Sequence, residues 1–196
     1  ATLSAAELEA RNDRFANCRP KTSSDYRVEA KVIRPLFQAE IRRYNWQHDL
    51  PPTAFQYDAC CLELALNPRP DSDVNFLNST QHNAFMSSGS CAFIPANQKT
   101  VARLKQGEHL VVSCLFDESV FAPYVNWQWT PLELAACTNL HNQHIQNALL
   151  RISQELLHPG YQADQWLDAQ FNYLLIELSR HIRATRTPLE LSLIHI

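Results

Sequence analysis

The chain has 196 residues, 45% of them hydrophobic and 19% charged, with a formal net charge of −3 at pH 7. This composition suits one globular domain with a real core and excludes a disordered chain. It also argues against direct nucleic-acid binding, because such domains usually carry a clustered positive excess. With only Gly89, Gly107 and Gly160 as glycines, the dinucleotide motif G-x-G-x-x-G and the phosphate loop G-x-x-x-x-G-K-[ST] are both excluded.

Residues 1–27 are predicted to form an N-terminal arm. Ser4 and Glu7 have the spacing of a capping box and predict a short helix over residues 4–16. Pro20 and the polar residues that follow it favour a loop. The whole stretch is polar enough to lie outside the core.

Residues 28–116 have the pattern of an all-β domain. Short runs rich in β-branched and aromatic residues, such as SCAFIP, TVARL and HLVVSCLF, alternate with turn clusters such as DLPPT, NPRPDSD and KQGE. That spacing indicates an antiparallel sandwich or barrel. In the run ACCLELAL, Leu62 and Leu64 share one face of the expected strand, and Glu63 lies on the other. A solvent-facing Glu63 is the simpler interpretation, and a buried, tuned acid is the alternative.

Six cysteines occur without any C-x-x-C motif, and two of them, Cys60 and Cys61, are adjacent. Adjacent residues of a strand point to opposite faces, so this pair cannot supply two ligands to one zinc ion. Cys91 and Cys114 lie inside apolar runs. We therefore expect reduced, buried thiols rather than disulfides.

From residue 117 the pattern changes to that of helices. Thr130, Pro131 and Glu133 predict an N-cap, a proline in the first turn and an acidic helix start. Apolar residues recur at helical spacing over 142–157 and again over 163–184. Because only a short turn separates these two segments, they predict an antiparallel helical hairpin over about 142–184.

Both helices of this hairpin carry more apolar residues than one buried stripe requires. We expect one stripe to pack on the barrel and the surplus, which includes Leu150, Leu157, Leu175 and Ile176, to meet a partner. A homodimer is expected, since two-fold pairing uses one patch twice. The sequence does not show which stripe faces the barrel. The candidate dimerisation residues are Ile145, Leu149, Ile152, Leu156, Phe171, Leu174, Leu178 and Ile182.

No catalytic or cofactor motif stands out in the chain. The nucleophile elbow G-x-S-x-G is absent. His141 and His144 stand three positions apart on a helix, but no carboxylate or cysteine follows one turn further on. We therefore expect no metal site, no cofactor and no enzymatic activity. The absence of a long apolar span and of a basic-then-apolar start predicts a cytoplasmic protein without membrane contact.

Several local motifs, in this order, resemble the N-terminal sensor domain of AraC/XylS-family transcription regulators. Residues 89–96, GSCAFIPA, are similar to the family's G-x-x-x-F-x-P-A strand and turn. Residues 114–117, CLFD, are similar to the strand that leads into its first short helix. Residues 140–160 are similar to its N-x-x-I-x-x-x-L-x-R-x-x-x-E-x-x-x-P-G helix, and residues 174–182 to the helix after it.

This resemblance covers about residues 30–185 and implies an α+β fold: a cupin-like antiparallel β-barrel followed by a C-terminal antiparallel helical hairpin, with domain limits 28–185. In that family the barrel binds a small effector, the helices dimerise, and a C-terminal pair of helix-turn-helix units binds DNA. Eleven residues follow Thr185, far fewer than such a module needs. Residues 186–196 are therefore expected to be a linker remnant and a non-native tail, and the chain a truncated regulator that does not itself bind DNA.

An effector pocket in such a barrel has a mostly apolar wall and a few polar anchors. The candidate ligand-binding residues, chosen for their strand-like context, are Arg42, Trp46, Tyr57, Glu63, Phe93, Arg103 and His109. Two alternatives stay open: a cupin-type enzyme, either an isomerase or a dioxygenase, and a carbohydrate-binding jelly roll. A metal-dependent cupin needs an H-x-H pair on one face of a strand, and none of the eight histidines forms one.

Overall fold

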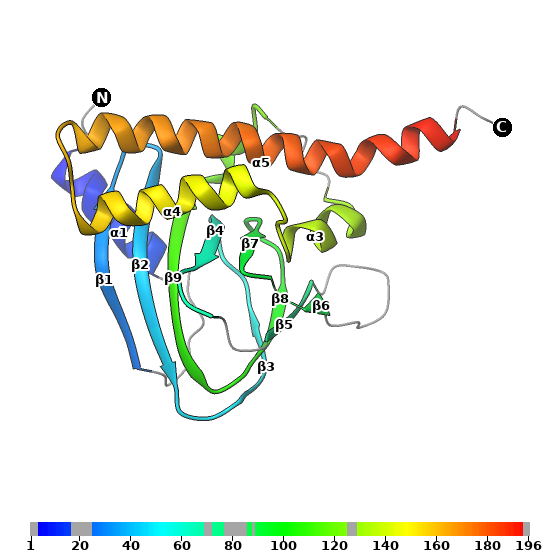
Figure 1. The fold of residues 1–196 in the computed structure, drawn as a ribbon, viewed down its shortest axis with the longest axis horizontal. Helices are drawn as coiled ribbons and strands as arrows, with labels where there is room; N and C mark the ends of the chain where they lie inside the picture. Colours follow the sequence, from blue (N-terminus) through cyan, green and yellow to red (C-terminus); the bar gives the residue numbers. More distant parts are fainter. Residues whose placement is uncertain are drawn as a thin grey trace.

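The computed structural model describes residues 4–16, 25–68, 72–76, 86–87, 89–124 and 129–193. Within these ranges the chain forms a short N-terminal helix, two antiparallel sheets and a group of C-terminal helices (Figure 1). The strands are β1 (Asp25–Ile33), β2 (Phe37–Trp46), β3 (Leu50–Phe55), β4 (Cys60–Ala65), β5 (Ser72–Phe76), β6 (Met86–Ser87), β7 (Cys91–Ile94), β8 (Thr100–Leu104) and β9 (Gly107–Phe116). The helices are α1 (Ala5–Ala16), α2 (Glu118–Phe121), α3 (Pro131–Cys137), α4 (Gln143–Leu157) and α5 (Ala163–Leu193).

The strands are ordered as in a jelly roll. One sheet has the order β1-β2-β9-β4-β7, and the other has the order β3-β8-β5-β6. The antiparallel pairs β2 with β9, β3 with β8, β4 with β7 and β5 with β6 alternate between the two sheets. Residues 37–116 thus follow the path of one long hairpin rolled into a sandwich, with β1 added at an edge. Cupins are jelly rolls of this kind, so the cupin-like α+β fold expected from the sequence is confirmed.

Both faces of the five-stranded sheet are covered, which explains its dense apolar sequence. Along β2, Phe37 and Ala39 point toward the helices, while Arg42 and Tyr44 point toward the second sheet, and all four are buried. The alternation of polar and apolar residues on this strand therefore separates two interior layers rather than a core from water.

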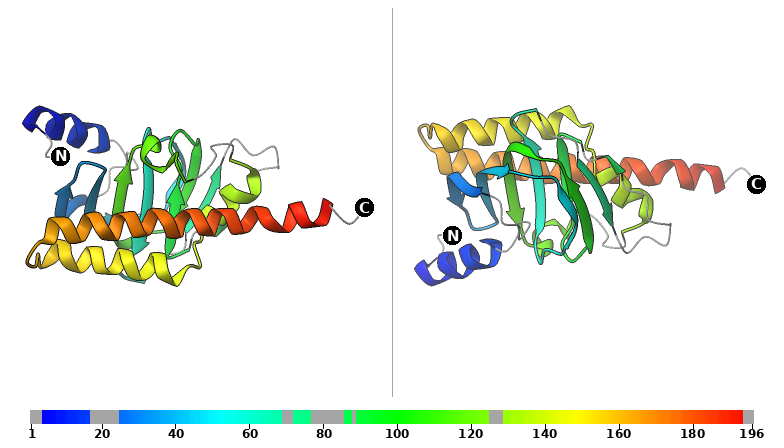
Figure 2. Two further views of the ribbon diagram at one scale, coloured as in Figure 1. Left: turned by 90° about the horizontal axis from the view of Figure 1, so that it is seen from above. Right: turned by 90° about the horizontal axis from the view of Figure 1, so that it is seen from below.

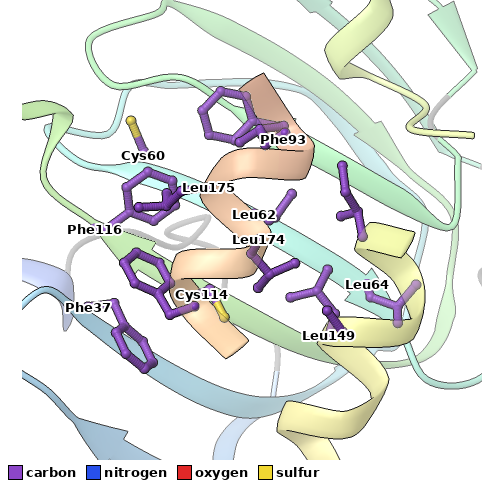
Figure 3. Close-up of a cluster of buried hydrophobic side chains, with 14 of the residues drawn as sticks. Phe37, Cys60, Leu62, Leu64, Phe93, Cys114, Phe116, Leu149, Leu174 and Leu175 are labelled. Atoms are coloured by element: carbon purple, nitrogen blue, oxygen red, sulfur yellow. The ribbon is translucent and has the colours of Figure 1, made fainter. Parts of the chain in front are cut away.

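The predicted helical hairpin is present and lies on the outer face of the five-stranded sheet. In both views of Figure 2, α4 and α5 run side by side along one side of the sandwich. The ring of Phe171 stacks on Phe37 with centroids 4.2 Å apart and meets Phe116 edge-on at 5.3 Å. Figure 3 shows Phe37, Phe116, Leu149 and Leu174 gathered between the sheet and the two helices. This is the largest apolar cluster among the described residues.

The structure corrects the choice of dimerisation residues. Seven of the eight candidates are fully buried within the chain, and Leu156 is half-buried against the same cluster. Their stripes are the ones that pack on the sheet, which burial of large side chains favours over any surface contact. The apolar side chains that the hairpin does expose are Leu150, Leu157, Tyr173 and Ile176, while Leu175 is buried. The candidates are Ile145, Leu149, Ile152, Leu156, Phe171, Leu174, Leu178 and Ile182.

The N-terminal helix is present, but it is more than a detached arm. Its capping box is formed as predicted: the Ser4 backbone N–H donates to Glu7 Oε2 at 2.8 Å, and the Glu7 N–H donates to Ser4 Oγ at 3.3 Å. Phe15, near the end of α1, is fully buried in a cluster with Tyr57 and Leu115. A single aromatic side chain in an otherwise polar helix thus fastens α1 to the barrel.

Helix α5 is longer than the periodicity predicts. The sequence places its end near residue 184, followed by a linker remnant, whereas the helix runs to Leu193 and passes through Pro188. A proline inside a helix removes one backbone hydrogen bond, and its ring crowds the carbonyl group four residues earlier. The neighbouring residues Leu189 and Glu190 are good helix formers. The last turns of α5 extend beyond the sandwich (Figure 1).

One glycine of the family-like motif has a packing reason. A Cβ added to Gly89 would lie 1.7 Å from the Asn139 side-chain oxygen, so any larger residue would displace that side chain. The Gly89 N–H also donates to the Thr138 carbonyl at 3.1 Å. The start of β7 is thereby held close to the end of α3.

The expectation of reduced, buried thiols is confirmed for five cysteines. Each is free and buried, and burial raises the pKa of the Cys114 thiol to about 12. Such thiols are inert because the reactive thiolate is strongly disfavoured. Cys18 lies outside the described residues. The five are Cys60, Cys61, Cys91, Cys114 and Cys137.

The predicted start of the helical region is confirmed at α3. Thr130 Oγ1 accepts a hydrogen bond from the Glu133 backbone N–H, and the Glu133 side chain accepts one from the Thr130 N–H at 2.9 Å. Pro131 stands in the first turn.

Candidate functional site

A cavity lies inside the sandwich, between the inner faces of the two sheets. Its volume of about 50 Å³ leaves room for about four water molecules. Aliphatic and aromatic side chains from β3, β5, β7 and β8 form much of its wall, and a few polar groups interrupt them. This is the composition of a small-molecule site. The lining residues with polar atoms in their side chains are Arg42, Tyr44, Trp46, Tyr57, Glu63, His109 and Thr138.

Six of the seven candidate ligand-binding residues lie on this lining, and Arg103 does not. Arg103 is exposed on β8, and its Nη2 donates to Asp73 Oδ2 at 2.9 Å. Its neighbour Ala102 lines the cavity instead, because successive residues of a strand point to opposite faces. The choice of Arg103 is corrected on this ground. The six on the lining are Arg42, Trp46, Tyr57, Glu63, Phe93 and His109.

Phe93 borders the cavity, but its ring belongs to the other layer. Its centroid lies 5.8 Å from that of Phe121, 5.9 Å from Trp129 and 6.2 Å from Phe116. These neighbours are in the cluster beneath the helices (Figure 3). A substitution of Phe93 would therefore disturb the core before it reported on a ligand.

Aromatic rings of β2 and β9 form a stacked column beside the cavity. The Tyr44 and Trp46 rings lie 5.2 Å apart at an interplanar angle of 15°. The His109 ring stacks on Trp46 at 5.7 Å, which the register of the two strands allows because Tyr44 stands directly opposite His109. Trp46 is buried, and its Nε1–H has no hydrogen-bond partner among the described residues. The Trp46 Nε1–H is therefore a hydrogen-bond donor available to a ligand beside the stacked rings.

A buried ion pair sits on the same face of β2. Arg42 Nε donates to Glu40 Oε2 at 2.7 Å, and Gln38 Nε2 donates to the other carboxylate oxygen. Lys31 Nζ approaches that oxygen at 3.2 Å from the neighbouring strand β1. Burial raises the pKa of the Glu40 carboxyl, but the charges and hydrogen bonds of Arg42 and Lys31 outweigh this effect, so its pKa lies below its ordinary value.

Glu63 faces the cavity rather than the surrounding water. It is half-buried on β4 and stands opposite Ser113 of β9 and Ala92 of β7. The simpler interpretation of the sequence, a solvated outward carboxylate, is therefore wrong. A single half-buried strand looks the same whether its polar face meets water or a second sheet, so local alternation could not decide the case.

One further lining residue could have been found from the sequence, and others could not. Tyr44 lies two residues from both Arg42 and Trp46, so the period of a strand would have added it. Val74 and Phe76 reach the cavity from β5, between segments rich in turn residues. No local signal marks them, because their place depends on how β5 pairs with β8.

The wall of the cavity does not fit a metal ion. Among the described residues, no group of three histidine, cysteine or carboxylate side chains lies close enough to share one.

Comparison with known proteins adds a set of distant structural likenesses. No family model and no curated protein matches the chain. It is similar to a cupin-superfamily protein of Desulfitobacterium hafniense, with 10% identity and a TM-score of 0.35 over 54% of this chain and 89% of the other. It is similar to the EutQ protein of Clostridium difficile, with 12% identity and a TM-score of 0.34 over 60% and 81%. An RmlC-like cupin family protein of Methanocaldococcus jannaschii gives 10% identity and a TM-score of 0.34 over 50% and 84%.

The class of the protein rests on the strand order given above, and it is a cupin-like α+β domain with a C-terminal helical hairpin. None of the helices that the structure describes is both long and apolar enough to span a membrane.

Proposed function

We propose that this chain is the effector-sensing and dimerisation portion of a transcription regulator of the AraC/XylS type. The observation that carries the proposal is the cavity enclosed by the jelly roll, whose largely apolar wall holds a buried guanidinium, an indole N–H and a carboxylate. A wall of this composition binds one small molecule and orients it through a few polar contacts. The motifs at residues 89–96 and 140–160 supply the likeness to the family.

The connection between the cavity and the helices supports a sensing role. Thr138, at the end of α3, is itself on the cavity lining. The Leu140 N–H, just before α4, donates to the Cys91 carbonyl of β7 at 2.8 Å. Ala92 and Ile94 of the same strand line the cavity. A ligand that displaces β7 therefore acts directly on the segment that leads into the hairpin.

A thermal-shift screen of small metabolites tests the binding function. A ligand at 100 times its Kd adds about 2.7 kcal/mol to the stability of the folded state. We expect Ala102→Leu, which fills the cavity, to abolish the shift while the protein remains folded by circular dichroism. The matched control is Arg103→Ala, the next residue of β8 but on its outer side, which should keep the full shift. A ligand shift that survives in Ala102→Leu would place the ligand elsewhere and overturn the proposal.

The dimerisation part of the proposal takes a second copy of this chain as the partner of α4. Leu150 and Leu157 are exposed, and their spacing of seven residues places them on one line along the helix. Gln154 stands between them and is uncharged, so two copies related by a two-fold axis meet there without like-charge repulsion.

The alternatives from the sequence, a cupin-type enzyme and a carbohydrate-binding jelly roll, would use the same cavity or the outer surface. Metal analysis of the purified protein and binding to a glycan array distinguish them from a sensor. A stoichiometric bound metal would favour the enzyme, and saturable glycan binding would favour the jelly-roll lectin.

A further inference from the structure

The charged side chains around the cavity differ in whether they have an ion-pair partner. Arg42 and Glu40 form a buried pair at 2.7 Å on the inner wall. Lys31 reaches the same carboxylate from a partly exposed position at 3.2 Å. Glu63 has no ion pair and no hydrogen bond with the described residues. Glu63 is therefore the carboxylate of the lining that is left for a ligand to pair with.

The space in front of Glu63 is open to the cavity because its cross-strand neighbours are small. Ala92 stands opposite it on β7, and Ser113 stands opposite it on β9. The Ser113 hydroxyl is buried, and its oxygen has no hydrogen-bond partner in the part of the chain that the structure describes. A carboxylate beside an unpaired hydroxyl favours a ligand group that carries positive charge and hydrogen-bond donors.

The remaining wall near Glu63 is aromatic. Burial raises the pKa of Tyr44 and Tyr57, and the negative charge of Glu63 raises both further, so the two phenols stay neutral. The rings of Tyr44, Tyr57, Trp46 and Phe55 line the cavity, and aromatic rings attract a cation through their negative faces. The Trp46 Nε1–H, which has no partner among the described residues, favours a ligand that carries one hydrogen-bond acceptor.

Building on the proposed effector site, we propose that its ligand is a small organic ammonium ion that also carries a hydrogen-bond acceptor. The ammonium group pairs with Glu63 among the aromatic faces, and the acceptor takes the Trp46 Nε1–H. The space of about four waters limits the ligand to about four non-hydrogen atoms, since benzene, with six, occupies a cavity of about 150 Å³. An anion of the same size would meet Glu63 without compensation.

Three small probes of similar size test the charge requirement by titration calorimetry on the full chain. 2-Aminoethanol, as its ammonium ion, carries a charged nitrogen and a hydroxyl. 1-Propanol replaces its nitrogen by carbon and is neutral, and glycolate keeps the hydroxyl and is an anion. We expect 2-aminoethanol to bind saturably, and the other two to bind at least about tenfold more weakly, because they lose the cation–π and ion-pair attraction.

Two carboxylate variants identify the residue responsible. Glu63→Gln keeps the size of the side chain and should weaken 2-aminoethanol binding by about tenfold or more, while the weak binding of 1-propanol stays unchanged. Asp73→Asn is the matched control, because Asp73 pairs with Arg103 outside the cavity lining. It should bind 2-aminoethanol like the unchanged chain. Circular dichroism confirms that each variant is folded.

The outcomes separate this inference from the proposed function. Equal binding of all three probes, or 2-aminoethanol binding that Glu63→Gln does not weaken, overturns the ammonium ligand and leaves a small-molecule cavity. Binding of none of the probes, with a metabolite shift that depends on Ala102, also overturns only the ammonium ligand. Failure of both the probes and the metabolite screen overturns the proposed function as well.

Discussion

Arg42 is a buried guanidinium whose charge is tolerated because Glu40 lies beside it. Removing two charges from water costs several kcal/mol per ion, and the pair recovers this only through close contact and the extra hydrogen bond from Gln38. Each of the two charged groups is therefore stable in the interior only beside the other. The same side chains form part of the inner wall of the sandwich, so their effects on stability and on binding have to be measured separately.

Arg42→Met should destabilise the protein by about 3 kcal/mol or more, because it leaves Glu40 buried without its main counter-charge. Urea unfolding followed by circular dichroism measures the change. The double variant Arg42→Met/Glu40→Leu should recover most of the loss, since it removes both charges. If Arg42→Met alone were as stable as the unchanged chain, the buried pair of Arg42 and Glu40 would not have the role given to it here.

The Glu40 pair also predicts a dependence of stability on pH. The folded-state pKa of Glu40 is lowered, so its contribution is complete above the unfolded pKa of about 4.3 and is lost as pH falls through the folded pKa. Glu40→Gln should flatten the fall in unfolding free energy between about pH 5 and pH 3. The control is Glu108→Gln, on the exposed end of β9, which should change this slope much less. An unaltered slope in Glu40→Gln would show that Glu40 does not cause this dependence of stability on pH.

At the scale of the element, the helical hairpin is fixed to the barrel by a polar clamp as well as by the apolar cluster. Arg34, in the turn between β1 and β2, donates from Nε and Nη2 to the two carboxylate oxygens of Asp168 at 2.9 and 2.7 Å. Its Nη1 lies 2.6 Å from Asp164 Oδ2. All three nitrogens of one guanidinium thus hold the first turns of α5.

Arg34→Ala should lower the unfolding free energy by about 1 to 2 kcal/mol, because a bidentate pair with a largely buried arginine is lost. Arg27→Ala is the matched control: its side chain is 70% exposed, against 17% for Arg34, and it binds Glu29 within its own strand. That control should change stability by less than about 0.5 kcal/mol. Hydrogen exchange should show faster opening of α5 in Arg34→Ala alone, and equal effects of the two variants would refute the clamp.

At the scale of the whole molecule, the hairpin separates a face needed for folding from a face available to a second copy. Leu149 is fully buried on the sheet, whereas its neighbour Leu150 is 44% exposed. Leu149→Glu should unfold the protein, since it buries an unpaired charge. Leu150→Glu should leave circular dichroism unchanged and shift the chain from dimer to monomer in sedimentation. A chain that is monomeric at high micromolar concentration before any substitution would contradict the homodimer.

The sequence alone was sufficient for features that depend on residues close together in the chain. The capping box at Ser4, the N-cap at Thr130 and the hairpin of α4 and α5 follow from spacings of three to eight residues. The buried thiols follow from their apolar neighbours. Six of the seven cavity candidates, all chosen for their strand-like context, do line the cavity.

Only the tertiary structure decided which face of each element points where. Arg103 turned outward, Glu63 turned inward, and the stripe expected at a dimer interface became the core. The physical reason is that periodicity places residues on the same or opposite faces of an element but does not say what covers each face. In a sandwich with helices on one side, an apolar stripe has more than one layer against which it can pack. Long-range strand pairing and helix packing decide which layer covers it.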